Sequence, residues 1–186
     1  MTQEEQAIPI DTLRQNLVVM LLQQGFRVDG DQLLPPEQTC KDNIRRLYAH
    51  LRLERLKEIR PWLLSVEKKL LPYFASGADI HVEQINPALI PVNTEFTSNL
   101  FRYASLLWSV PVSSGYGRRM RFLVFDEHND KLIGLFGLCD PVYNLRTRDQ
   151  WIGWNVNDKN ERLYHVMDAY VLGAVPPYSY LLGGKL

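Results

Sequence analysis

One segment of the sequence, residues 119–138, constrains the fold more than any other because it has the pattern of a β-hairpin. RMRFLVFDE (119–127) and KLIGLFGL (131–138) are rich in large apolar side chains, and the HND between them is typical of a tight turn. Phe122 and Val124 are two residues apart, the spacing that places both side chains on one face of a strand. The sequence therefore predicts two antiparallel strands here.

Further strands and helices are predicted on both sides of this hairpin. Two prolines in INPALIPV (85–92) favour an extended segment or an edge strand, because proline cannot donate to a sheet ladder. Helical spacing begins at Asn93 or Thr94 and continues to Leu107. After the hairpin, the sequence predicts a helix near 156–167, a strand at 169–177 and the first turn of another helix from Tyr178. This order of elements indicates an α+β fold.

The first third of the chain has a helical pattern instead. Apolar residues at helical spacing predict a helix over residues 10–25, with Asp11 as its N-cap. The segment GDQLLPPEQ (30–38) is interpreted as a linker, because its two prolines cannot lie inside a helix. A long basic helix is expected after Thr39, and Pro61 is expected to begin another.

Composition and charge set the domain plan and suggest one surface. The chain has 186 residues and is 46% hydrophobic, which is enough for one domain with a core and a small helical attachment. We therefore predict a helical N-terminal region, residues 1–76, and an α+β domain, residues 77–186. The formal net charge is zero, but residues 41–69 carry nine bases and four acids. This excess is typical of a solvated helix face and also of a surface for an anionic polymer, on which helical phase brings Arg45 and Arg52 together.

Several standard chemistries find no support in the sequence. Cys40 and Cys139 are far apart, so neither a disulfide framework nor a zinc ribbon is indicated. The four histidines have no metal-binding spacing, no GxSxG motif occurs, and the apolar runs are too short to span a bilayer. Because no secretory signal pattern is present, we expect a soluble cytoplasmic protein with no membrane partner. GGK near the C-terminus lacks the rest of a phosphate-binding loop, but Gly183 and Gly184 leave room for a phosphate of a cofactor near the backbone.

The stretch CDPVYNLRTRDQWIGW (139–154) gathers large, polar-tipped and charged side chains, and three interpretations stay open. In the first, Trp151 and Trp154 are anchors that pack this connection onto the hairpin. In the second, it is a preformed nucleic-acid surface where arginines bind phosphates and aromatic rings stack on unpaired bases. Its residues, with those of the basic helix, are Arg45, Arg52, Tyr143, Arg146, Trp151 and Trp154. In the third, a carboxylate is a general base and an arginine holds an anion, with the candidates Asp140, Arg148, Asp149 and His165.

The later half of the chain also resembles known families. A hairpin followed by a strand and a glycine-bearing helix start is similar to acyltransferases of the acetyl-CoA type (GNAT-like), whose glycine loop holds a pyrophosphate. More specifically, RDQWIGW (148–154) and its surroundings resemble the Druantia antiphage protein A family, long catalogued as a domain of unknown function. The residues that carry this resemblance are Gly134 to Gly137, Asp140, Arg148, Asp149, Trp151 to Trp154, Arg162, Leu163 and His165. It covers most of the chain, including the helical N-terminal portion.

This resemblance implies both a function and a fold. It implies a component of a bacterial antiphage defence system, encoded beside partners that include a large helicase-like protein, and found also in mobile elements. The later half is expected to be GNAT-like but incomplete, since family members continue past the glycine-bearing helix. We therefore predict a defence component that acts on or with nucleic acid, DNA or RNA, together with partner proteins. The alternatives are an acyl-CoA-dependent transferase that modifies a nucleobase or a protein, and a non-catalytic interaction module or mobile-element-associated protein.

Overall fold

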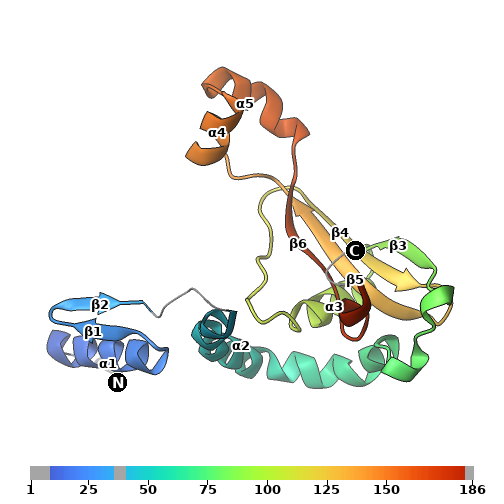
Figure 1. The fold of residues 1–186 in the computed structure, drawn as a ribbon, viewed down its shortest axis with the longest axis horizontal. Coiled ribbons are helices and arrows are strands. Elements are labelled where there is room, and N and C mark those ends of the chain that lie inside the picture. The colour runs from blue at the N-terminus through green and yellow to red at the C-terminus, as the bar shows by residue number, and fades with distance from the viewer. Residues whose placement is uncertain (1–8, 36–40, 183–186) are drawn as a thin grey trace, which may run out of the picture. The chain divides into compact units, whose positions relative to one another are not determined.

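Figure 1 shows the fold in a computed structural model, which describes residues 9–35 and 41–182 except the side chains of Leu47 and His50. The chain separates into two compact units, Met1–Glu58 with Ser109–Pro111, and Ile59–Trp108 with Val112–Leu186. A domain division at residue 76 stays a prediction. Within the described part of the chain, no helix combines the length and the apolar character that a membrane span requires.

The second unit is built on a four-stranded antiparallel sheet with the order β3-β4-β5-β6 (Figure 1). The strands are β3 (Pro87–Pro91), β4 (Arg119–Asp126), β5 (Lys131–Cys139) and β6 (Asp168–Ala174). β4 and β5 confirm the predicted hairpin, and β3 confirms the predicted edge strand with a proline at each end. β6 ends at Ala174, earlier than the predicted residue 177, because Pro176 and Pro177 have no N–H for a sheet ladder. The predicted mixture of helices with an antiparallel sheet is therefore confirmed.

One helix, α3 (Glu95–Ser105), covers one face of the sheet and forms the core with it. The Thr94 hydroxyl caps this helix by accepting from the backbone N–H of Thr97 at 3.1 Å, as the sequence predicts for Asn93 or Thr94. The buried side chains that pack together here are Leu70, Leu100, Phe101, Ala104, Leu123, Leu132, Leu135, Val171 and Val175. Burial of this apolar area is the main stabilising contribution to the unit.

Helix α2 (Lys41–Leu70) is continuous, so the prediction that a separate helix begins at Pro61 is wrong. A proline inside a helix removes one hydrogen bond and usually costs stability. Contacts with α3 compensate directly after it, where the Trp62 indole N–H donates to Asn99 at 3.2 Å and the Arg102 guanidinium lies 3.9 Å from the Trp62 ring. Three short 3₁₀ helices then lead to β3, namely η1 (Leu71–Tyr73), η2 (Gly77–Asp79) and η3 (Val82–Gln84).

The first unit contains a short helix and a small hairpin, α1 (Ile10–Gln23), β1 (Arg27–Asp29) and β2 (Gln32–Leu34). α1 confirms the predicted helix, but Pro9 occupies the N-cap position, and Asp11 lies in the first turn. The prediction that residues 30–38 are a linker is wrong for their first part. Residues Asp29 and Gln32 pair across a two-residue turn, in which Gly30 has φ +58°, a conformation that glycine adopts without steric cost.

Between β5 and β6 the chain forms a small lobe, residues 141–167, which stands at one end of the sheet (Figure 1). Its helices are α4 (Arg146–Ile152), α5 (Val156–Arg162) and the 3₁₀ helix η4 (Leu163–His165). The helix predicted near 156–167 is therefore shorter, and the 139–154 stretch contains a helix that periodicity did not reveal. Beyond β6, α6 (Tyr178–Leu182) confirms the predicted helix start, while Gly183 and Gly184 lie outside the described residues.

Candidate functional site

The lobe has two seven-residue helices and very little apolar core of its own. Isolated helices of this length are unstable in water, so contacts with their surroundings must hold them. α4 contains no buried residue, and the one buried side chain of α5 is that of Lys159. Leu163, in η4, is also buried. A polar network therefore takes the place that an apolar stripe has in most helices.

Arg148 is the centre of this network. Its Nη1 donates to the carbonyl of Val142 at 2.7 Å, and its Nη2 donates to the carbonyl of Tyr143 at 3.0 Å. Its Nε and Nη2 also donate to Oδ1 of Asp149, at 2.9 and 2.7 Å. All three guanidinium nitrogens thus have partners, and the side chain is only 15% exposed. Arg148 fastens α4 to the chain that leaves β5.

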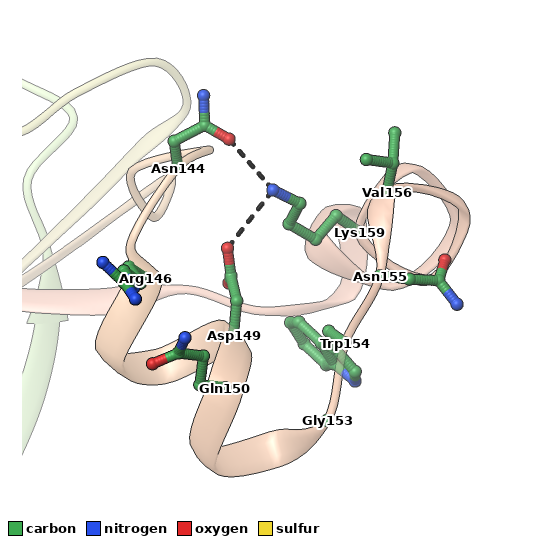
Figure 2. Close-up of a pocket in the computed structure, with 9 residues that line it drawn as sticks. All are labelled: Asn144, Arg146, Asp149, Gln150, Gly153, Trp154, Asn155, Val156 and Lys159. Carbon is green, nitrogen blue, oxygen red and sulfur yellow. Dashed lines mark hydrogen bonds and ion pairs between the residues drawn. The ribbon is translucent and has the colours of Figure 1, made fainter.

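Lys159 joins α5 to α4 through the same carboxylate (Figure 2). Its Nζ lies 3.2 Å from Oδ2 of Asp149 and donates to Oδ1 of Asn144 at 2.9 Å. The sequence reasoning did not single out Lys159, because a lysine within VNDKNER resembles an ordinary solvated residue. The sequence signal that could have revealed Lys159 was the capping box of Asn155 and Asp158, because it fixes where α5 begins and therefore which of its side chains face inward.

The ionisation of Asp149 follows from these contacts. Burial raises the pKa of its carboxyl, but the hydrogen bonds and positive charges of Arg148 and Lys159 outweigh this effect and hold the pKa below its ordinary value. A general base for neutral pH works best with a pKa near 7. The geometry therefore favours an ion-paired, supporting carboxylate, and catalysis by Arg148 and Asp149 stays a prediction.

Arg118 fastens the lobe to the start of the hairpin, and an ion pair with Asp140 holds the Arg118 side chain. Oδ1 of Asp140 accepts from Nε of Arg118 at 2.7 Å, while Oδ2 accepts from the backbone N–H of Arg118 at 2.8 Å. These bonds from Arg118 hold the pKa of Asp140 below its usual value. The same guanidinium donates to the carbonyl of Tyr164 at 2.7 Å and lies 4.3 Å from its ring. His165 is exposed, with a ring contact to Tyr164, so catalytic roles for Asp140 and His165 stay predictions.

A pocket of about 430 Å³ opens between α4 and α5. Figure 2 shows the residues that line it: Asn144, Arg146, Asp149, Gln150, Gly153, Trp154, Asn155, Val156 and Lys159. Trp154 is half-buried, and its ring lies 5.9 Å from the Arg148 guanidinium. Trp151 does not line the pocket and is 88% exposed, so it is not the packing anchor of the first interpretation.

The structure gathers some of the predicted residues and separates others. Arg146, Asp149 and Trp154 meet at the pocket, whereas Tyr143 does not line it, although its ring lies 4.9 Å from Nζ of Lys159. Arg45 and Arg52 belong to the other compact unit, so a shared face with the lobe stays a prediction. Across the residues that the structure describes, no three histidine, cysteine or acidic side chains converge as a metal site would require.

The fold and site together define a mixed α/β protein with an antiparallel sheet and a polar, tryptophan-bearing lobe. The chain belongs to the family of the Druantia protein DruA, whose family model matches residues 38–186, and this confirms the resemblance found in the sequence. The Druantia protein DruA of Escherichia coli (strain UMEA 4076-1) is 49% identical over 164 residues, which are 87% of this chain and 40% of that protein. The chain thus spans less than half the length of this relative. No solved structure matches it.

Proposed function

We propose that this chain is part of a component of a Druantia-type antiphage defence system, and that its lobe binds nucleic acid. Membership of the DruA family supports the defence role. Partner proteins, including a helicase-like protein, would act with it, as the resemblance to the Druantia family implies.

The observation that carries the nucleic-acid proposal is the contrast between the interior and the surface of the lobe. Inside, Arg148 and Lys159 are ion-paired with one carboxylate and are at most 15% exposed. Outside, the lobe presents Trp151, 88% exposed, and Tyr164, 69% exposed. Exposed aromatic rings beside arginines suit single-stranded nucleic acid, because bases stack on the rings and phosphates pair with the cations. A ligand that stacks on Trp151 would explain why the polar network of the lobe holds this large apolar side chain in contact with water.

The salt dependence of DNA binding tests this proposal. We expect two phosphate contacts, from Arg146 and from a second exposed cationic side chain of the lobe such as Arg162. At about −0.7 per contact on single strands, the slope of log K against log salt should be about −1.4. Titration of a labelled oligonucleotide with the protein at several salt concentrations measures this slope. A slope near zero, or no binding at low salt, would exclude the nucleic-acid proposal.

A second function, acyl transfer from acyl-CoA, is favoured by the order of elements in the later half. The β4–β5 hairpin, β6 and the start of α6 occur in the same order along the chain as the hairpin, strand and cofactor-binding helix start of GNAT-like enzymes, although here the lobe is inserted before β6 and β6 ends the described sheet. If acetyl-CoA binds, a concentration of 100 Kd should raise the Tm by about 5–10 °C in a thermal scan. No thermal shift and no heat of binding would count against this function. If neither DNA nor acetyl-CoA binds, the remaining candidate function is that of a non-catalytic interaction module.

A further inference from the structure

We propose that the pocket between α4 and α5 holds one unpaired nucleobase of a nucleic-acid strand, stacked on Trp154, with an adjacent phosphate on Arg146. This inference rests on the proposed function and specifies the ligand of that site. It separates the two tryptophans of the WIGW motif: Trp154 takes a base into a pocket, and Trp151 offers an open surface.

The backbone of Trp154 is held by hydrogen bonding at the end of α4 before any ligand arrives. Gly153 ends α4 with φ +83°, and the backbone N–H of Trp154 donates to the carbonyl of Asp149 at 2.8 Å. The Arg148 guanidinium, itself tied by its own hydrogen bonds, lies 5.9 Å from the indole ring. Because its backbone is held and its ring is half-buried, Trp154 loses less conformational entropy than a free side chain when a flat group stacks on it.

The charged groups inside the pocket already have partners, so few groups remain for a ligand. Asp149 and Lys159 are paired with each other. Within the described part of the chain, no side-chain hydrogen bond or ion pair engages Arg146 or Gln150, and Asn144 uses its Oδ1 and not its amide nitrogen. The pocket therefore presents an aromatic face, amide donors and acceptors, and one free guanidinium.

This combination matches a nucleotide. An indole face suits a flat aromatic ring, carboxamides suit the hydrogen-bonding edge of a base, and a guanidinium suits a phosphate. The volume of about 430 Å³ lies within the usual range of small-ligand pockets. A base inside a duplex has both faces covered by its neighbours and its edge paired, so the pocket selects an unpaired base.

The test compares the 186-residue chain with two tryptophan variants on matched DNA. The protein is titrated into a labelled short oligonucleotide, as a single strand and as the duplex of the same sequence. We expect the wild type to prefer the single strand. Trp154→Ala should weaken single-strand binding about 10-fold, which corresponds to about 1.4 kcal/mol, with a much smaller loss on the duplex. Trp154→Phe should keep most of the affinity, because it keeps a ring that stacks.

Trp151→Ala is the matched control, since it removes a tryptophan three residues away that does not line the pocket. It should weaken single-strand binding less than Trp154→Ala does, because an open surface encloses no base, and it should leave duplex binding nearly unchanged. Equal affinity of the wild type for both forms, with Trp154→Ala binding as the wild type does, would overturn the pocket inference and leave the proposed function standing. If the wild type binds neither form, the proposed function itself fails.

Two further measurements keep the test decisive if Trp154→Ala does not fold, as judged by circular dichroism. In the Trp151→Phe background, which removes the other stacking tryptophan of the lobe, stacking of a base should quench tryptophan fluorescence, and the further change Trp154→Phe should abolish most of that quenching. The exposed Gln150→Ala should change the preference among oligonucleotides of different base composition. Quenching that persists when Trp154→Phe is added to Trp151→Phe would overturn the inference. A mononucleotide that quenches as strongly as a strand would also overturn it, in favour of a free-nucleotide site.

Discussion

Asp126→Ala should lower the free energy of unfolding by about 3 kcal/mol or more, because it leaves the buried Tyr178 hydroxyl and two partly buried backbone N–H groups without this acceptor. Asp126 ends β4 and is 1% exposed. Its Oδ1 accepts from the backbone N–H groups of Asn86 and His128, at 3.0 and 3.2 Å, and its Oδ2 accepts from the Tyr178 hydroxyl at 2.7 Å. These bonds join the start of β3, the hairpin turn and α6. Chemical unfolding of the variant and the wild type measures the loss.

Tyr178→Phe is the control, since it keeps the buried ring and removes one donor. Burial and the hydrogen bond to Asp126 raise the pKa of Tyr178 to about 12. A raised pKa in the folded state gives stability that is present below the unfolded pKa near 10 and is lost as the pH rises towards 12. The stability advantage of the wild type over Tyr178→Phe should therefore shrink above pH 10. An advantage that stays constant up to pH 11.5 would contradict this network.

Low pH should also weaken the hydrogen-bond network of Asp126, because it protonates the carboxylate. Burial raises the pKa of Asp126, but the hydrogen bonds from Asn86, Tyr178 and His128 lower it by a larger amount. The pKa of Asp126 therefore lies below its ordinary value. A depressed pKa gives stability that is present above the unfolded pKa, near 3.9, and is lost as the pH falls through the folded pKa. A variant that lacks this carboxylate should show less of that acid dependence.

Sequence reasoning found the elements of the sheet because their signals are local. The hairpin of β4 and β5 is readable from apolar strands around a turn, and β3 from its prolines. The role of Asp126 was not readable, because a carboxylate before a turn is usually solvated, and its partner Tyr178 lies 52 residues away. The prediction that a helix begins at Pro61 was wrong because the contact of Trp62 with α3 overrides the local preference of proline.

At the site, sequence reasoning identified the important stretch and assigned its charges less well. Arg148 and Asp149 stand out as neighbours, but adjacency does not reveal that both side chains turn inward onto Val142, Tyr143 and Lys159. That orientation depends on the ion pair between the two short helices, in which a lysine of α5 reaches the same carboxylate. Arg146, two residues earlier in α4, is exposed instead. Helical phase thus gives neighbouring arginines of one motif different tasks.

A matched pair of substitutions in α4 should separate these tasks. Arg148→Ala removes charge-assisted hydrogen bonds to three acceptors and should destabilise the lobe by about 2–3 kcal/mol. Because the lobe has little apolar core, we expect it to open without unfolding of the sheet, so amide hydrogen exchange in α4 and α5 should accelerate about 30-fold or more. Arg148→Lys should not restore protection, since an ammonium cannot reach several fixed acceptors as a guanidinium fork does.

Arg146→Ala should have the opposite profile. Exchange in α4 and α5 should stay as in the wild type, because this exposed side chain supports no other group that the structure describes. Single-strand binding should weaken, and the slope of log K against log salt should become shallower by about 0.7, the value expected for one lost phosphate contact. If Arg146→Ala accelerates exchange as Arg148→Ala does, the separation of scaffold from surface is wrong. If it leaves the salt slope unchanged, Arg146 does not contact phosphate, and the basic group that faces the strand must lie elsewhere on the lobe.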